Sequence, residues 1–160
     1  MPRFFGGTGD DGYTDLLGNR RVPKSHLKPA AYGAVDEASA ALGLARALAD
    51  SEAIKLVIEE AQRDLYSIMS EVAAEPEVAE RFRTLGPDRI NWLETQVEQF
   101  GDEVQMPKGF VISGDTPASA ALDLARTAVR RAERAAVRLA LEEEGSFSVK
   151  DTHSLVYLNR

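Results

Sequence analysis

The sequence predicts an all-α protein, an antiparallel bundle of five helices that follows an irregular, glycine-rich N-terminal loop. Apolar residues recur at helical spacing from Pro29 onward, and short links between such long stretches are typical of a bundle. Residues 1–25 are rich in Gly, Asp, Thr and Asn, and nothing in them alternates long enough to predict a strand. The 160 residues suit a single domain, with helices over 29–160 and no linker to divide it.

The first two helices are expected to be joined by a link of one or two residues. The first runs from Pro29 to Ala49, because proline suits the first turn of a helix and an apolar stripe follows it. Asp50 or Ser51 can cap the second helix. Its stripe extends from Ile54 to Val72, with apolar residues three and four positions apart.

The third and fourth helices are marked by prolines at their starts. The third is expected to begin near Pro87 and to stop at Gly101, because glycine commonly ends a helix. The fourth is the clearest, since Thr116 is a capping residue, Pro117 follows it, and alanine-rich sequence continues to about Glu144. At a rise of ~1.5 Å per residue, this helix would be on the order of 40 Å long.

The fifth helix is expected to open at residues 148–151. Their sequence, Ser-Val-Lys-Asp, has the pattern of a capping box with Asp in place of Glu. Leu155, Val156 and Leu158 follow, and the sequence runs to Arg160 with no Gly or Pro to stop the helix.

Composition excludes several classes of function. Acidic residues outnumber basic ones by 26 to 19, and the net charge of −7 argues against a general nucleic-acid binder. It leaves room for an anionic ligand beside a local cluster of arginines. The absence of cysteine excludes thiolate chemistry and cysteine-based metal sites, and two histidines are too few for a histidine-rich one. No signal-peptide core or membrane-spanning run is present, so a cytoplasmic protein is expected.

The N-terminal segment from Gly6 to Thr14 has the composition of a phosphate-binding loop. Its glycines let backbone N–H groups approach an anion closely, and its threonines add hydroxyl donors. Gly7, Gly9 and Gly12 match a dinucleotide-binding pattern only formally, because no strand precedes them and no helix follows directly. A flexible tail is the alternative interpretation, at about even odds on composition alone.

One stripe of the fourth helix is strongly basic. Its members are spaced at i, i+4, i+7 and i+8: Arg126, Arg130, Glu133 and Arg134. Such a row is normally a solvated surface, yet three arginines in a net acidic protein also suit a triphosphate, because guanidinium groups bind phosphate oxygens in bidentate fashion. In the first helix, Asp36 and Glu37 are adjacent acidic residues. Such a pair usually lies on a face exposed to solvent.

Taken together, these segments resemble the PduO-type ATP:corrinoid adenosyltransferases. The resemblance spans nearly the whole chain, and its most specific part is A-R-T-x-x-R-R-A-E-R followed by Y-L-N-R. The matching segments are T-G-D-x-G-x-T at 8–14, Lys24, A-Y-G-x-V-D-E at 31–37, Q-x-x-L-[FY] at 62–66, Phe110-Val111, A-R-T-x-x-R-R-A-E-R at 125–134 and Y-L-N-R at 157–160.

The resemblance implies a homotrimer of five-helix subunits that binds ATP and Mg²⁺ between neighbours and adenosylates cob(I)alamin or a related corrinoid. Arg126 would pair with Asp36 of the adjacent subunit, Arg130 would contact the triphosphate near the breaking bond, and Phe110 would face the corrin ring. Magnesium would be held mainly by the phosphates, and the expected protein partners are a reductase and an adenosylcobalamin-dependent acceptor enzyme. The other residues implied in ATP binding are Thr8, Gly9, Asp10, Gly12, Thr14, Lys24, Glu133, Arg134 and Asn159.

The chain also departs from the family pattern. Gly6 and Gly7 replace a Thr and a basic residue, Ser113-Gly114-Asp115 replaces Pro-Gly-Gly, and Asp123 replaces a His. The family's last helix continues past Y-L-N-R, where this sequence stops. These differences keep open a second class of function, a helical sensor or corrinoid carrier that has lost catalysis. For Phe110, the alternative to a corrin contact is a loop anchor that fills the end of the bundle.

Overall fold

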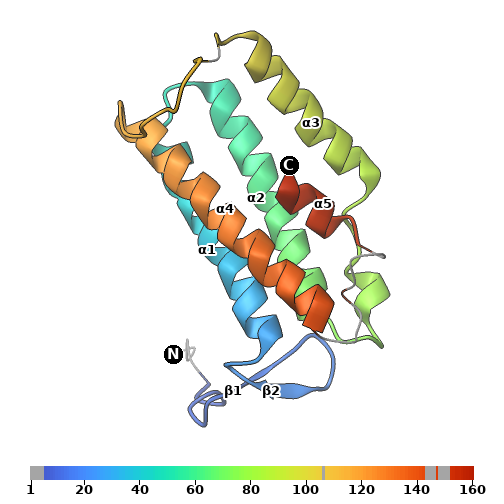
Figure 1. Cartoon of the computed structure of the whole chain (residues 1–160). Helices are drawn as coiled ribbons and strands as arrows, with labels where there is room; N and C mark the ends of the chain where they lie inside the picture. Colours follow the sequence, from blue (N-terminus) through green and yellow to red (C-terminus); the bar gives the residue numbers. More distant parts are fainter. Residues whose placement is uncertain (1–5, 106, 143–146, 148–151) are drawn as a thin grey trace.

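The protein is a bundle of antiparallel helices, as predicted (Figure 1). The computed structural model describes residues 6–105, 107–142, 147 and 152–160. Helix α5 packs against α4 and α3 and is hydrogen-bonded to side chains of α2, and the N-terminal segment lies beyond the first turn of α1. The elements are β1 (Tyr13–Asp15), β2 (Arg21–Pro23), α1 (Leu27–Leu48), α2 (Glu52–Ala73), the single-turn 3₁₀ helix η1 (Ala79–Arg81), α3 (Pro87–Asp102), α4 (Pro117–Glu142) and α5 (Ser154–Asn159).

Local signals in the sequence explain where the long helices begin. The Ser51 hydroxyl accepts from the backbone N–H of Ile54 at 3.4 Å, which caps α2. The Thr116 hydroxyl accepts from the N–H of Ser119 at 3.1 Å and caps α4. The expected end of α3 at Gly101 is off by one residue, because this glycine stays helical instead of adopting the left-handed conformation of a cap.

Small side chains dominate the contact between α1 and α4. Because most of the buried side chains are small, the two helices can pack closely. In the described parts of the chain, no helix is long and apolar enough to cross a membrane. The buried residues are Lys28, Ala31, Val35, Ala38 and Ala45 on α1 and Ala121, Ala125, Ala128, Ala132, Ala136 and Leu139 on α4.

The N-terminal segment contains a hairpin that the sequence analysis did not expect. β1 and β2 pair antiparallel, with Thr14 opposite Val22. Each strand has three residues, which is too short for an alternating pattern to be recognised in the sequence. The hairpin is fixed to the end of α2, because Leu17 N–H donates to the carbonyl of Ala73 at 3.0 Å and Glu75 N–H donates to that of Leu17 at 2.9 Å.

The fifth helix begins later than the sequence suggested. The expected capping box at 148–151 and the expected end of α4 at Glu144 lie outside the described residues. Thr152 and His153 are described and are not helical, and α5 starts at Ser154. The Thr152 hydroxyl accepts from the N–H of Ser154 at 3.0 Å.

Because Ile68 is fully buried in the main core, Ile68→Ala is expected to lower the free energy of unfolding by about 2–5 kcal/mol. Leu56→Ala on the same helix is the control, since Leu56 is exposed and its removal should change stability by about 0.5 kcal/mol or less. Urea denaturation followed by circular dichroism measures both. Equal losses for the two variants would contradict this description of the core.

Candidate functional site

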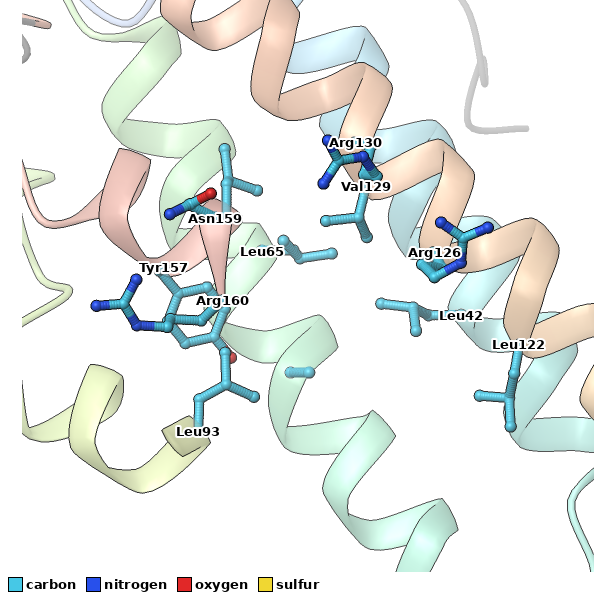
Figure 2. Close-up of a pocket in the computed structure, with 12 residues that line it drawn as sticks. Leu42, Leu65, Leu93, Leu122, Arg126, Val129, Arg130, Tyr157, Asn159 and Arg160 are labelled. Carbon is cyan, nitrogen blue, oxygen red and sulfur yellow. The ribbon is translucent and has the colours of Figure 1, made fainter. Parts of the chain in front are cut away.

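A cavity of about 350 Å³ opens between α4 and α5 (Figure 2). Its walls are mostly leucine, valine and alanine side chains from the long helices, and polar groups stand at two facing edges. Arg126 and Arg130 lie on α4 at one edge, and Asn159 and Arg160 lie at the C-terminal end of α5 at the other. The site therefore combines an apolar floor with cationic and amide groups, which suits a ligand that is partly apolar and partly anionic.

The arginine row lies on the exposed side of α4. Arg126, Arg130 and Arg134 are exposed and Glu133 is half-buried. Arg126 Nε donates to Asp123 Oδ1 at 2.8 Å, and this bond, followed by one from Ser113, holds the pKa of Asp123 below its usual value. In the described structure Glu133 and Arg134 do not line the cavity, so the row contributes two of its members to it.

A buried polar network supports the opposite edge, and the sequence analysis missed it. Tyr157 hydroxyl donates to Asp64 Oδ2 at 2.7 Å, and Arg89 donates to the same carboxylate through Nε at 2.9 Å and Nη2 at 2.8 Å. The Arg89 guanidinium also lies 4.3 Å from the centre of the Trp92 ring. The available signal was an aspartate in register with the apolar stripe of α2, directly before Leu65.

A second hollow lies beside the loop that precedes α4. It is lined by residues 110–115 and by Ser119, Asp123 and Arg126 of α4, so Arg126 borders both hollows. Phe110 is 97% exposed, and Ile112 beside it is 81% exposed. Phe110 therefore does not fill the end of the bundle. Two large apolar side chains stand open to solvent at this place, which is the usual mark of a binding surface.

The N-terminal loop is an ordered turn that brings Lys24 onto its glycines. A Cβ atom at Gly9 would lie 3.0 Å from Lys24 Nζ and 3.3 Å from the carbonyl oxygen of Tyr13, so only glycine fits there without a shift. Lys24 N–H donates to the carbonyl of Gly12 at 2.9 Å. Gly12 has a φ of +84°, which side chains rarely adopt.

Arg21 neutralises one of the two acidic side chains in this loop. It donates to both carboxylate oxygens of Asp11 at 2.9 Å and also to the carbonyl of Thr8. The backbone N–H of Tyr13 and the Arg21 guanidinium hold the pKa of Asp11 below its usual value. Asp10 is exposed, and in the described residues no three His, Asp or Glu side chains gather as a metal site.

The predicted site residues fall into separate groups within one chain. Arg126, Arg130 and Asn159 meet at the cavity, whereas the loop and Lys24 lie beyond the first turn of α1 (Figure 1). Asp36 is exposed on α1 and forms no ion pair with any residue in the described part of the chain. Its neighbour Glu37 is bound to Arg131 at 2.5 Å. A single chain thus holds the two halves of the expected nucleotide site apart.

Comparison with known proteins gives consistent matches. A model of the cobalamin adenosyltransferase family matches residues 5–160. The chain is 35% identical over 136 residues to the corrinoid adenosyltransferase PduO of Salmonella typhimurium, which is 84% of this chain and 40% of that protein. It is 33% identical over 160 residues to the corrinoid adenosyltransferase of Bacillus subtilis, which is 96% of this chain and 77% of that protein.

The fold also matches solved structures. One is a phenylalanine-to-histidine variant of a PduO-type ATP:corrinoid adenosyltransferase from Lactobacillus reuteri, complexed with cobalamin and ATP. It superimposes with a TM-score of 0.87 at 30% identity, over 98% of this chain and 83% of that chain. The chain spans less than half the length of the PduO proteins of Salmonella typhimurium and Citrobacter freundii, 40% and 44% respectively.

The ion pair between Asp11 and Arg21 in the N-terminal loop is expected to depend on pH. Because the folded pKa of Asp11 is lowered, the pair is intact above the ordinary pKa of ~3.9 and is lost as the pH falls through the lower folded value. Arg21→Gln should move this pKa part of the way back up, since the N–H of Tyr13 remains. NMR titration of the carboxyl carbon measures it, and Arg20→Gln is the control. An unchanged Asp11 pKa in Arg21→Gln would exclude the pair.

Proposed function

The chain belongs to the cobalamin adenosyltransferase family, and we propose that it transfers the 5′-deoxyadenosyl group of ATP to Co(I) of cobalamin or another corrinoid. One observation carries the proposal. Arg126 and Arg130, from the A-R-T-x-x-R-R-A-E-R segment, share one cavity with Asn159 from the Y-L-N-R segment. The two segments that are most specific to the family therefore meet in space, although they lie about 30 positions apart in the sequence.

The proposed reaction is a displacement at the ribose 5′ carbon of ATP. A cobalt–carbon bond forms, the bond from that carbon to the triphosphate oxygen breaks, and inorganic triphosphate leaves with the electron pair. Since the cobalt of the substrate is the nucleophile, no side chain has to act as nucleophile or general base. The protein contributes alignment of the two substrates and stabilisation of charge on the leaving group, the role proposed for Arg130.

We place the nucleotide between two subunits. The loop of one subunit, with Thr8, Gly9, Asp10 and Lys24 among its proposed ligands, would face the cavity of the next. Support comes from the separation of these groups within one chain and from the exposure of Asp36, which is available to pair with Arg126 of a neighbour. Magnesium would be held mainly by the phosphates, because this ion keeps water and phosphate oxygens as ligands in most nucleotide sites.

Phe110 is the proposed contact with the corrin ring. Its almost complete exposure, beside Ile112 and next to a hollow that Arg126 shares with the cavity, supports this assignment. An aromatic ring against one face of the corrin would exclude water from the cobalt and so weaken axial donation to it. Control of the axial ligand makes the metal easier to reduce, which favours the Co(I) state that the reaction requires.

The wider assignment follows from the same activity. The chain would act as one domain over residues 1–160 in the cytoplasm, with a reductase and an adenosylcobalamin-dependent acceptor enzyme as partners. The alternative, a sensor or carrier without catalysis, predicts binding of ATP and corrinoid without formation of the cobalt–carbon bond. Anaerobic incubation with ATP and reduced cobalamin separates the two, because only the enzyme yields the adenosylcobalamin spectrum.

Arg130→Ala is expected to lower kcat in that assay by on the order of 10²–10³-fold, with a smaller change in the KM for ATP. The reason is that negative charge on the leaving triphosphate grows toward the transition state. Arg138→Ala is the control, because Arg138 is an exposed residue of the same helix that pairs with Glu142. A normal kcat with weaker ATP binding would instead make Arg130 a ground-state ligand.

The shared site requires an oligomer, and a homotrimer is expected. Size exclusion with light scattering should give about three times the 17.4 kDa chain mass. Asp36→Arg should weaken assembly, because the new guanidinium group would face Arg126 of the neighbouring subunit. Asp36→Arg combined with Arg126→Asp should restore it. A monomer at micromolar concentration in the presence of ATP would rule out the shared site.

A further inference from the structure

Two buried carboxylates of α2 hold α5 in place. The Ser154 hydroxyl donates to Glu71, and one turn later on α5 the Tyr157 hydroxyl donates to Asp64 at 2.7 Å. Glu71 and Asp64 are seven residues, or about two turns, apart on one face of α2. Both carboxylates and both hydroxyl-bearing residues are buried. A helix of six residues is too short to be stable by itself, so its position depends on its contacts with the bundle. These two hydrogen bonds act there together with the core packing of Tyr157 and Leu158.

Asp64 is the better compensated of the two carboxylates. Arg89 reaches it through two nitrogen atoms at 2.8 and 2.9 Å, and Trp92 covers the guanidinium. A buried charge is costly unless it is paired and hydrogen-bonded, which makes this arrangement rigid in geometry. Hydrogen bonding to Asp64 raises the pKa of Arg89 further above its ordinary value, so the guanidinium stays charged.

Tyr157 links the Asp64–Arg89 pair to the α5 edge of the cavity. Burial, followed by its bond to Asp64, raises the pKa of the Tyr157 hydroxyl well above its ordinary value, so the group remains a proton donor. Asn159 comes two residues later and lines the cavity that Arg130 faces from α4 (Figure 2). Arg160, the next residue, is bound to Glu94 of α3.

We propose that Asp64 and Arg89 are positioning residues for the nucleotide site and act through Tyr157. Together they fix where α5 lies along α2 and thereby set the position of Asn159 opposite Arg130. Asp64 and Arg89 do not line the cavity themselves, whereas Tyr157 does. The test must therefore separate a displaced Asn159 from the loss of a direct contact made by Tyr157. The inference rests on the proposed function, because it takes Asn159 to contact the nucleotide.

Tyr157→Phe tests the inference most directly, since it removes one hydroxyl and keeps the packed ring. We expect kcat/KM for ATP to fall on the order of tenfold, because small misplacements of a site residue have large kinetic effects. Tyr66→Phe is the matched control. It removes the hydroxyl of an exposed tyrosine on α2 and should leave kcat/KM unchanged. Circular dichroism should show that both variants keep the helical content of the parent.

A double-mutant cycle separates positioning from a general effect on stability. If Tyr157 acts through Asn159, then Tyr157→Phe should change kcat/KM by about twofold or less once Asn159→Ala is present. The dissociation constant of ATP, measured by calorimetry on the chain without corrinoid, gives a second reading of the same cycle. An equal loss with and without Asn159 would overturn the inference, as would no loss in Tyr157→Phe.

Arg89→Lys is the second variant, to be used also if Tyr157→Phe does not fold. It keeps the positive charge and loses the two-pronged contact with Asp64. We expect the same direction of change, again dependent on Asn159, with Arg138→Lys as the control. A parent chain that neither binds ATP nor forms adenosylcobalamin would refute the proposed function. An active parent whose Arg89→Lys and Tyr157→Phe variants are fully active would refute the positioning role alone.

Discussion

The close contact between α1 and α4 is the constraint on which the other features depend. Most buried residues of both helices are alanines, and close packing on them fixes the orientation of α4 about its own axis. With Ala125, Ala128 and Ala132 turned toward the core, Arg126 and Arg130 must point away from α1 or along its edge. The place of the arginine row on α4 is therefore a consequence of core packing.

Two buried carboxylates on α2 help to fix the position of α5 in the same way. An all-apolar contact would hold so short a helix with little specificity for one position along α2, because hydrophobic burial is not directional. Hydrogen bonds from Tyr157 to Asp64 and from Ser154 to Glu71 are directional and allow one register. A small-residue contact thus positions the α4 edge of the cavity and a polar contact positions the α5 edge, and the two helices also share the main core.

The proposed reaction suits a chain without cysteine and with two histidines. In the proposed reaction the corrinoid brings the nucleophile and ATP brings the leaving group. The protein then needs accurately placed cations, hydrogen-bond donors and an apolar surface, all of which it has. Asp11, which would repel a phosphate, is already bound to Arg21, so the loop is less acidic in its folded form than its sequence indicates.

The sequence by itself determined the long helices and predicted three of the residues that line the cavity, Arg126, Arg130 and Asn159. Apolar spacing and local capping groups such as Ser51 and Thr116 act over a few residues, so they can be recognised in a linear sequence. The strands of the hairpin could not be recognised, because three residues are too few to show an alternation. Only the tertiary structure decided that Asp64 would be bound by Arg89 and Tyr157, which lie 25 and 93 positions away. Pairing over such distances depends on how the helices pack, and no local pattern encodes it.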